Sequence, residues 1–229
     1  MPVHSNNNAS IRPFPQVDKT LHGLRIRNTS AADIPQLVAL HMQHFDPSEF
    51  SILLGQEVVQ QFYDYAVSSP CASLLVAVEG EKVFGFSLAF QAYEQFLAGF
   101  KSRALFAVFK RLTSLALGLR WISLKQVAQH LVVSDLYSPP AEVKNYHLGV
   151  IILDPEQAKS PQHILVFSEA FKVNIGLVKA ANAGGCWTSV AKHNKKSLRI
   201  VKALLKPDEQ YNMRDIPTAS WCFVCHKAG

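Results

Sequence analysis

Residues 146–155, Tyr-His-Leu-Gly-Val-Ile-Ile-Leu-Asp-Pro, are the stretch of this chain that decides its fold. The apolar centre predicts a buried strand, which ends at the Asp-Pro pair because proline cannot donate to a strand ladder. A loop then leads into a predicted helix from Ser160 to about residue 183. A second strand, Cys186–Val190, leads to Asn194 and another helix. The C-terminal half therefore has the order strand, loop, helix, strand, asparagine, helix.

The N-terminal half consists of periodic segments separated by turn residues. A flexible arm rich in Asn, Ser and Pro comes first, and an alternating strand and two amphipathic helices follow. Two apolar strands around Gly80 then predict an antiparallel hairpin. These segments are residues 1–22, 24–27, 30–41, 48–66, 73–78 and 83–90.

The composition is that of an ordinary globular protein. The chain has 229 residues, of which 48% are hydrophobic and 17% charged, so it can form a core without disulfides. Its net charge of +6 suits acidic partners such as CoA phosphates or anionic lipid, while no nucleic-acid motif accompanies the charge. We find no secretory signal and no apolar span of membrane length, and therefore expect a cytoplasmic protein.

The segment between the hairpin and the Tyr146 strand, about residues 91–143, is basic and amphipathic. It has no acidic residue between Glu94 and Asp135, but it has six lysines and arginines interleaved with aromatic and aliphatic residues. This pattern predicts one or two basic helices. They could cap an acceptor site with a solvated basic face, or rest on an anionic membrane. If they rest on a membrane, reversing Lys110 and Arg111 to Glu should abolish binding to anionic liposomes.

This order of elements, with the segment Phe50-Ser-Ile-Leu-Leu-Gly55 on the second helix and the basic insertion, resembles the GNAT acyltransferase superfamily. The resemblance covers about residues 24–206. It implies an α+β fold with a mixed, mostly antiparallel sheet flanked by helices, in one domain over residues 23–229. It also implies transfer of an acyl group, most simply acetyl, from a CoA or acyl-carrier thioester to an amine. The alternative is a catalytically inactive GNAT-fold binding protein, associated with a membrane surface.

The resemblance implies that the strand splays from its neighbour, so that the pantetheine arm of the donor pairs with its main chain at Ile151, Ile152 and Leu153. In the family, glycines of the next loop let backbone amides at the helix start hold the CoA pyrophosphate. Here that loop is Ala158-Lys-Ser-Pro-Gln-His163.

Two of the family's glycine positions in this loop carry unsuitable residues. Pro161 has no N–H to donate, and His163 is bulky. Either the site has decayed, or side chains such as Lys159, Ser160 and His163 hold the phosphates. A third hypothesis is an acyl carrier protein as donor, which presents one phosphodiester instead of a pyrophosphate.

Asn194 and Ser197 match the family's Asn-x-x-Ala/Ser pattern, in which the asparagine contacts the pantetheine arm. Asn194 could equally be a simple helix N-cap. Lys195 and Lys196 could meet the adenosine phosphate or be solvated.

The candidate catalytic residues differ from those that the family commonly has at the same positions. His147 stands where the family often has a glutamate, and a neutral imidazole could take an amine proton near pH 7. A strand-end histidine bonded to a loop is the alternative. Further candidate bases are Glu142, Tyr146 and Asp135. Val201 stands where the family commonly has a tyrosine that protonates the thiolate, so that Tyr211 or water would have to replace it.

The sequence Cys222-Phe-Val-Cys-His226 satisfies the pattern for covalent haem attachment. It lies in an apolar run that predicts the last strand, where residues three apart face opposite sides. We therefore predict neither haem nor another metal.

Overall fold

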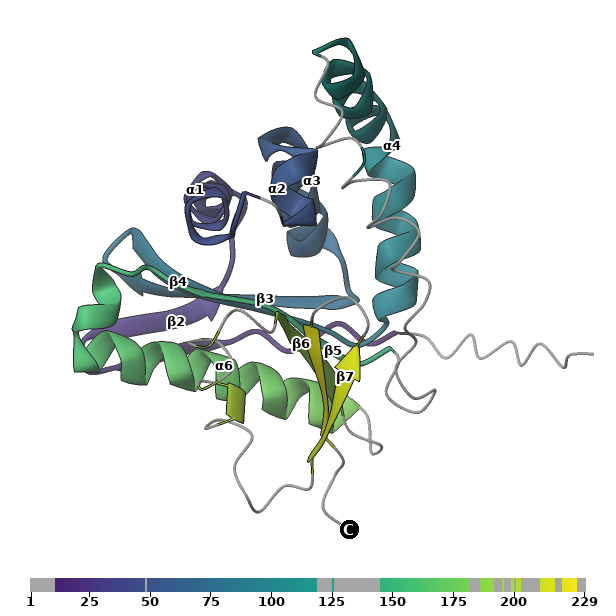
Figure 1. Ribbon diagram of the computed structural model, residues 1–229. Helices are drawn as coiled ribbons and strands as arrows, with labels where there is room; N and C mark the ends of the chain where they lie inside the picture. Colours follow the sequence, from purple (N-terminus) through teal and green to yellow (C-terminus); the bar gives the residue numbers. More distant parts are fainter. Residues whose placement is uncertain are drawn as a thin grey trace, which may run out of the picture.

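The computed structural model describes residues 11–47, 49–118, 125, 145–181, 186–191, 195, 199, 201–202, 211–216 and 220–225. Strands and helices alternate along the chain (Figure 1). The strands are β1 (Asp18–Leu21), β2 (Leu24–Asn28), β3 (Ala72–Glu79), β4 (Lys82–Phe90), β5 (His147–Leu153), β6 (Cys186–Ala191), β7 (Tyr211–Ile216) and β8 (Ser220–Cys225). The helices are α1 (Ile34–His44), α2 (Phe50–Leu54), α3 (Gln56–Ser68), α4 (Tyr93–Leu117) and α6 (Pro161–Ala181), with short 3₁₀ turns at Ala31–Asp33 (η1) and Gln157–Lys159 (η3).

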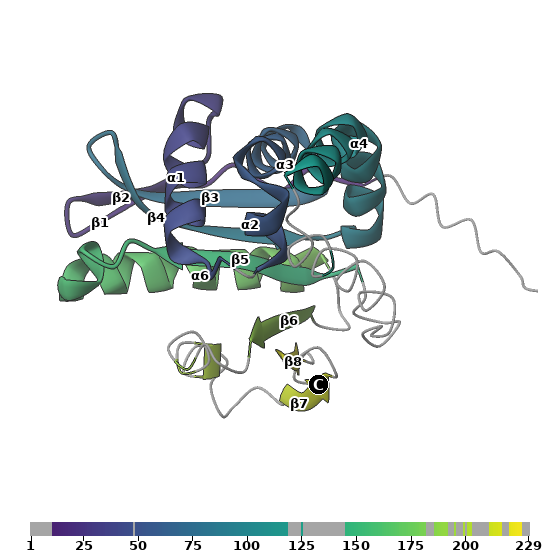
Figure 2. The ribbon, with the colours of Figure 1, turned by 45° about the horizontal axis from the view of Figure 1, so that its top comes forward.

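The strands form one sheet in the order β1-β2-β3-β4-β5-β6-β8-β7. Among the strands that the structure describes, β5 and β6 pair in parallel and every other neighbouring pair is antiparallel. Helices α1 to α4 cover one face of the sheet and α6 covers the other (Figures 1 and 2). The predicted α+β fold with a mixed, mostly antiparallel sheet is therefore confirmed.

The central strands are buried on both faces, which explains their nearly continuous apolar sequences. Alternate residues such as Val76 and Phe86 pack under α1 and α3. The intervening Leu75 packs on α6 at Phe167, and so does Phe84, which is the extra residue where the β3–β4 register shifts between Ala77 and Val78. The hairpin predicted from the Gly80 turn is confirmed, with Gly80 at φ 60°.

The sheet begins with a strand that the sequence did not predict. Residues 18–21, assigned to a flexible arm, form β1 and pair with β2. The strand lies at the sheet edge and is largely exposed, so its sequence Asp-Lys-Thr-Leu lacks the apolar alternation of a half-buried strand. Asp18 on β1 pairs with Arg25 on β2 through two hydrogen bonds of 2.7 and 2.6 Å.

The single helix predicted for residues 48–66 is wrong, because the chain forms α2 and α3 with a break at Gly55. The φ of Gly55 is 87°, a conformation that residues with a side chain rarely adopt. The Gly55 N–H bonds back to the carbonyls of Ser51 and Ile52, which ends α2. Arg111 of α4 donates from Nε to the Leu53 carbonyl at 3.0 Å, which fixes α4 against this break.

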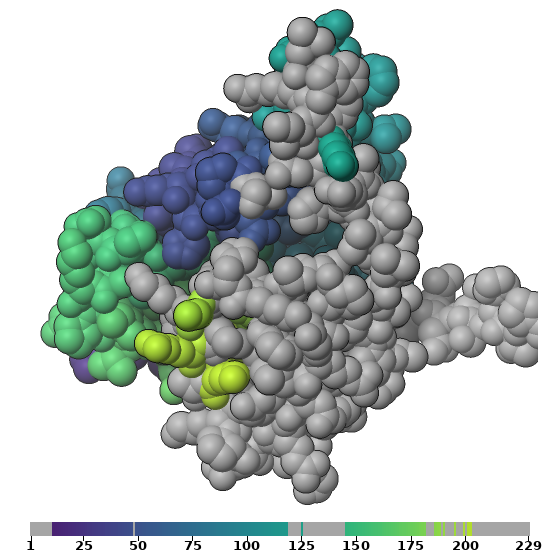
Figure 3. Space-filling model, viewed as in Figure 1, coloured from purple at the N-terminus to yellow at the C-terminus, as the bar shows by residue number. Residues whose placement is uncertain are grey.

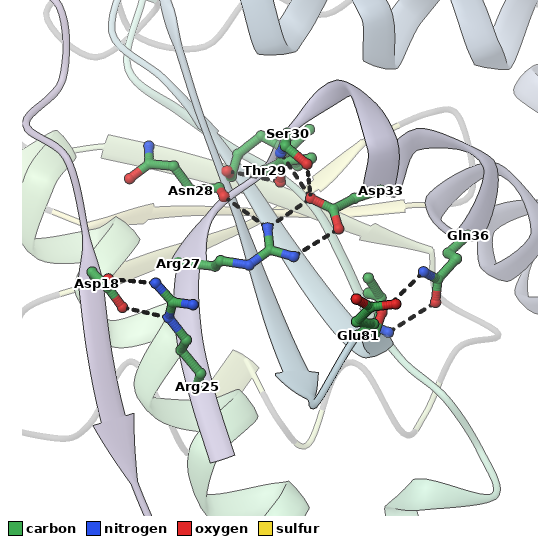
Figure 4. A network of polar contacts seen from close by, with 11 residues as sticks. Asp18, Arg25, Arg27, Asn28, Thr29, Ser30, Asp33, Gln36 and Glu81 are labelled. Carbon is green, nitrogen blue, oxygen red and sulfur yellow. Dashed lines mark hydrogen bonds and ion pairs between the residues drawn. The ribbon is translucent and has the colours of Figure 1, made fainter. Parts of the chain in front are cut away.

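A largely buried ion pair fixes the start of α1 to β2 (Figure 4). Arg27 donates two hydrogen bonds to the Asp33 carboxylate, at 2.7 and 2.8 Å. Ser30 adds two more bonds, from its N–H at 2.8 Å and its hydroxyl at 2.7 Å. Burial alone would raise the pKa of Asp33, but the bonds from Arg27 and Ser30 outweigh it and lower the pKa to about 2.

Three side chains from three helices form a second buried polar link. His41 of α1 shares hydrogen bonds with Tyr63 of α3 at 2.7 Å and with Ser51 of α2 at 2.8 Å. Burial, with a smaller effect from His44, lowers the pKa of His41 to about 4, so the ring is neutral at pH 7. The link holds the helical layer together above the sheet.

Helix α4 accounts for part of the predicted basic insertion. Residues 119–124 and 126–144, which complete it, lie outside the described residues. No helix within the described part of the chain is long and apolar enough to span a bilayer.

Candidate functional site

The parallel strands β5 and β6 separate almost at once, and this separation creates the candidate site. Their register has a single matched pair, His147 with Trp187. The Trp187 N–H donates to the Tyr146 carbonyl at 2.9 Å. The Thr188 hydroxyl then donates to the Leu148 carbonyl at 2.7 Å, and so occupies the acceptor that the next ladder bond would use. Figure 2 shows β6 leading away from β5. The splayed strand that the family resemblance implied is confirmed.

The register with β4 tells which main-chain groups of β5 face this opening. Asp154 donates its N–H to the Phe84 carbonyl at 2.8 Å, and Ile152 is one strand period away. In an antiparallel ladder the main-chain groups of alternate residues point to opposite sides. Ile152 therefore bonds toward β4, whereas Ile151 and Leu153 direct their N–H and C=O groups toward the opening.

Strand β5 carries a bulge beside the opening. From Ser87↔Ile151 to Ala89↔Leu148, β4 advances two residues while β5 advances three. The extra residue lies at Gly149–Val150. Bulges are common next to active sites, because they redirect main-chain groups out of the ladder. Glycine is required here, since a Cβ on Gly149 would lie 2.9 Å from the Phe90 ring and 3.3 Å from the Leu88 carbonyl oxygen.

Asn174 of α6 fixes β4 at this bulge. It is fully buried, and its Nδ2 donates to the Ser87 carbonyl at 2.9 Å and to the Ser87 hydroxyl at 2.8 Å. Its Oδ1 accepts a bond from the Ser73 hydroxyl at 2.7 Å. Sequence reasoning missed this residue. The signal was a single amide within the apolar face of the helix, where a buried polar group needs partners.

The start of α6 lies next along the chain after β5. The helix begins at Pro161 after Ser160, as predicted, and the Ser160 carbonyl accepts the Ile164 N–H at 3.1 Å. The Ser160 hydroxyl lies 3.5 Å from the His163 N–H, which is a weak capping bond. Since Pro161 has no N–H, the first helical turn offers an anion fewer amides than usual. Lys159 pairs with Glu156 at 2.8 Å and is largely exposed.

His163 packs against the sheet. Its ring meets Phe84 edge to face at a centroid distance of 4.5 Å, and the residue is 8% exposed. Its Nε2 lies 3.5 Å from a Glu79 carboxylate oxygen, which is within ion-pair distance when the ring is protonated but too poorly aligned for a hydrogen bond. A role for His163 in phosphate binding would need the ring to turn away from Phe84, so it stays a prediction.

His147 lies in an aromatic cluster where α4 begins. Its ring stacks on Trp187 at 4.0 Å and contacts Tyr93 at 4.5 Å and Phe90 at 5.9 Å. Its Nδ1 is buried and has no hydrogen-bond partner within the described part of the chain. Loss of solvation lowers the pKa of His147 to about 3. The ring is neutral at pH 7 but a very weak base, which argues against the predicted proton transfer from an amine.

The other predicted site residues fall into three groups. Tyr146 is half-buried beside the cluster around Phe171, and Val201 is buried in that cluster, where it packs as a core residue. Tyr211 is the first residue of β7, and Lys195 is exposed. Five residues lie outside the described residues: Asp135, Glu142, Asn194, Lys196 and Ser197.

The predicted last strand is confirmed as β8, which contains both cysteines of the Cys-x-x-Cys-His sequence. Cys222 lies opposite Ser189 and Cys225 lies opposite Cys186. That the two thiols face opposite sides of the strand stays a prediction from the sequence.

Comparison with known proteins gives similarity in structure alone. No family model matches the sequence, and the search of curated proteins found no match. The solved structure of SsHAT covers 90% of this chain and 100% of its own, at 14% identity and a TM-score of 0.57. An uncharacterized protein from Bacillus halodurans covers 94% and 91%, at 8% identity and a TM-score of 0.53. The ribosomal-protein-alanine N-acetyltransferase of Brucella melitensis covers 89% and 99%, at 11% identity and a TM-score of 0.50.

The splayed strand pair, the flanking helices and these structural neighbours together define the class of the fold. The chain has the fold of the GNAT acetyltransferases and is highly divergent in sequence.

Proposed function

We propose that this protein transfers an acyl group, most simply acetyl, from a thioester donor to an amine. One observation carries the proposal, namely the opening between β5 and β6. There Ile151 and Leu153 present main-chain groups that pair with no strand among the described residues, and an extended pantetheine arm could pair with them as an added strand. This use of the opening is the common one in proteins of this fold.

In the proposed reaction the amine nitrogen attacks the thioester carbonyl. The carbonyl oxygen becomes negative, and a main-chain N–H released by the bulge at Gly149–Val150 would stabilise it. The C–S bond then breaks, the amine loses a proton to a base, and the thiolate leaves and takes up a proton. Because His147 is a very weak base, we favour Glu142 or Tyr146 as the base, with Tyr211 or water as the proton donor to the thiolate.

The donor is proposed to be an acyl-CoA, with Lys159, Ser160 and the first turn of α6 near its phosphates. Asn194 and Ser197 would contact the pantetheine arm. An acyl carrier protein is the second candidate donor, because the proline in the first turn of α6 weakens a pyrophosphate site. A single phosphodiester needs fewer amides, and the net charge of +6 suits an acidic carrier. No metal has a role in either scheme.

A catalytically inactive binding protein is the alternative function. Two observations favour it: the enclosed His147 ring and the buried Val201 where a proton-donating tyrosine is common. A cytoplasmic location and contact with an anionic membrane also stay predictions from the sequence.

Calorimetric titration with acetyl-CoA, a long-chain acyl-CoA and an acyl carrier protein thioester tests the proposal. We expect micromolar binding of at least one donor, and release of free thiol when an amine is added. Binding without thiol release over a broad panel of amines would support the inactive alternative. If the folded protein binds none of the three donors, the proposed function is wrong.

A backbone substitution gives a matched control for the same titration. Replacing the Ile151 amide by an ester removes the N–H that faces the opening, and should weaken donor binding about tenfold. The same replacement at Ile152 removes an N–H that points to β4, and should leave donor affinity unchanged. Equal effects at the two positions would contradict the proposed pairing.

A further inference from the structure

The outward side of α4 exposes large apolar side chains. Phe106 is 76% exposed and Phe109 is 66% exposed. At 100° per residue, they and two exposed leucines fall within about a third of the helix circumference. Exposed groups of this size on one helix face commonly mark an interaction site. We call this set the outer face of α4: Leu105, Phe106, Phe109 and Leu117.

Basic residues flank the outer face on both sides. Lys101 and Arg103 are exposed, and neither has an acidic partner within the part of the chain that the structure describes. At helical spacing, Lys101 lies on the Leu105 side of the face and Arg103 on the opposite side. The only acidic residue in α4 is Glu94, in its first turn. The outer face is therefore apolar at its centre and positive at its edges.

We infer that the outer face of α4 binds an anionic membrane surface, with the helix lying in the headgroup region. Apolar and aromatic residues between cationic edges are the pattern of helices that lie in this interface. Helix α4 is not apolar enough to cross a bilayer. A second copy of the chain is a poorer occupant, because a two-fold contact would bring the cations of both outer faces together without acidic partners.

The outer face of α4 lies far along the helix from the strand β5. The helix begins beside β5, where the Tyr93 N–H donates to the Asn145 carbonyl at 3.0 Å. Its exposed apolar residues lie 12 to 24 positions further on, about 18–36 Å along the axis at 1.5 Å per residue. In Figures 1 and 3 the far end of α4 rises above the helices that cover the sheet. Membrane binding by α4 therefore does not require acyl transfer at the opening between β5 and β6.

The structure changes which residues should test membrane binding. Lys110 pairs with Glu57 of α3 at 2.9 Å, and Arg111 bonds the end of α2. Reversing the charges of Lys110 and Arg111, as the sequence suggested, would therefore disturb the packing of α4 as well as its charge. Lys101 and Arg103 carry no such contacts among the described residues, so they are the sharper choice.

The test is co-sedimentation of the full chain with vesicles of phosphatidylcholine, with and without 30% phosphatidylserine. We expect binding to the anionic vesicles, little binding to the neutral ones, and loss of binding in high salt. Lys101→Glu with Arg103→Glu should weaken binding at least 30-fold, from about a fivefold contribution per basic residue. Phe106→Ser with Phe109→Ser should weaken it by a similar factor. All of these side chains are exposed, so far-UV circular dichroism should show folded variants.

The matched control is Lys82→Glu with Lys172→Glu, which lowers the net charge equally but lies on the β3–β4 hairpin and on α6. Unchanged binding by this control supports a specific surface on α4. The inference is wrong if the native chain does not bind anionic vesicles, or if the control weakens binding as much as the α4 variants. It is also wrong if sedimentation velocity shows a dimer that Phe106→Ser with Phe109→Ser dissociates.

Discussion

At the scale of single residues, Asp33 shows how one carboxylate fixes two elements. Its oxygens accept bonds from Arg27 of β2 and from Ser30, and it stands at the start of α1. An acidic residue suits the positive end of a helix, so the sequence around Ser30 and Asp33 is consistent with a helix start. The arginine partner is not predictable from the sequence, because that contact depends on where β2 lies beside the helix.

Asp33→Asn should therefore destabilise the fold in a pH-dependent way. The pKa of Asp33 is lowered to about 2, so its ionisation contributes stability that is complete above the unfolded-state pKa near 3.9. This contribution is lost as the pH falls through about 2. We expect a loss of about 1–2 kcal/mol at pH 7 and almost none at pH 2, measured by urea unfolding. Asp18→Asn, at an exposed ion pair, should show no such pH-dependent loss; equal behaviour of the two variants would contradict the account.

The low pKa of the His147 ring, which stacks in an aromatic cluster, leads to a prediction about pH and activity. With a pKa of about 3, the ring stays neutral from pH 5 to pH 9. The pH profile of kcat/KM should therefore lack an inflection from His147 in this range, and His147→Gln should retain the shape of the native profile. An inflection near pH 6.5 that disappears in His147→Gln would show that this residue is the base after all.

At the scale of elements, Asn174 connects α6 to β3 and β4 beside the bulge. Asn174→Ala would leave the Ser87 carbonyl and the Ser73 hydroxyl buried without their partner. We expect a loss of about 2–3 kcal/mol in the free energy of unfolding, with weaker donor binding. Lys172→Ala, two residues away on the exposed side of the same helix, should change stability by less than about 0.5 kcal/mol. A neutral Asn174→Ala would mean that the amide does not fix the strand.

Two glycines of neighbouring elements should respond oppositely to alanine. A Cβ on Gly149 of β5 would press on Phe90 and on the Leu88 carbonyl, so Gly149→Ala should cost about 1–3 kcal/mol and reduce donor affinity. A Cβ on Gly176 of α6 meets nothing within 4 Å, so Gly176→Ala should stabilise the helix by about 0.5–1 kcal/mol. Thermal unfolding of both variants checks this pair, and a stabilised Gly149→Ala would exclude a tight bulge.

The sequence predicted elements well where the apolar period is strong. The hairpin, β5, α6 and β6 lie where it placed them, because each buries one or both faces. It failed at β1, an exposed edge strand, and at Gly55, where an amphipathic pattern continues across a backbone break. The spacing of apolar residues shows which face of a helix is buried. It does not show a break in the backbone when the helices on both sides of the break bury the same face.

At the scale of the whole molecule, the candidate site depends on distant segments meeting. The strand with the Asp-Pro end was predictable, and so was its separation from β6 through the family resemblance. The bulge at Gly149–Val150, the Thr188 hydroxyl that ends the ladder and the Asn174 contact were not. Each depends on strand register, which is set by packing across the sheet, and local sequence does not determine it.

Residue-resolved amide hydrogen exchange on β5, with and without donor, tests the central claim most directly. In the free protein the amides of Ile151 and Leu153 should exchange faster than that of Ile152, which bonds to β4. Adding acetyl-CoA, or the carrier thioester if calorimetry selects it, should slow exchange at Ile151 and Leu153 at least tenfold and leave Ile152 unchanged. Donor binding that leaves Ile151 and Leu153 unprotected would contradict an acyl-donor site between β5 and β6.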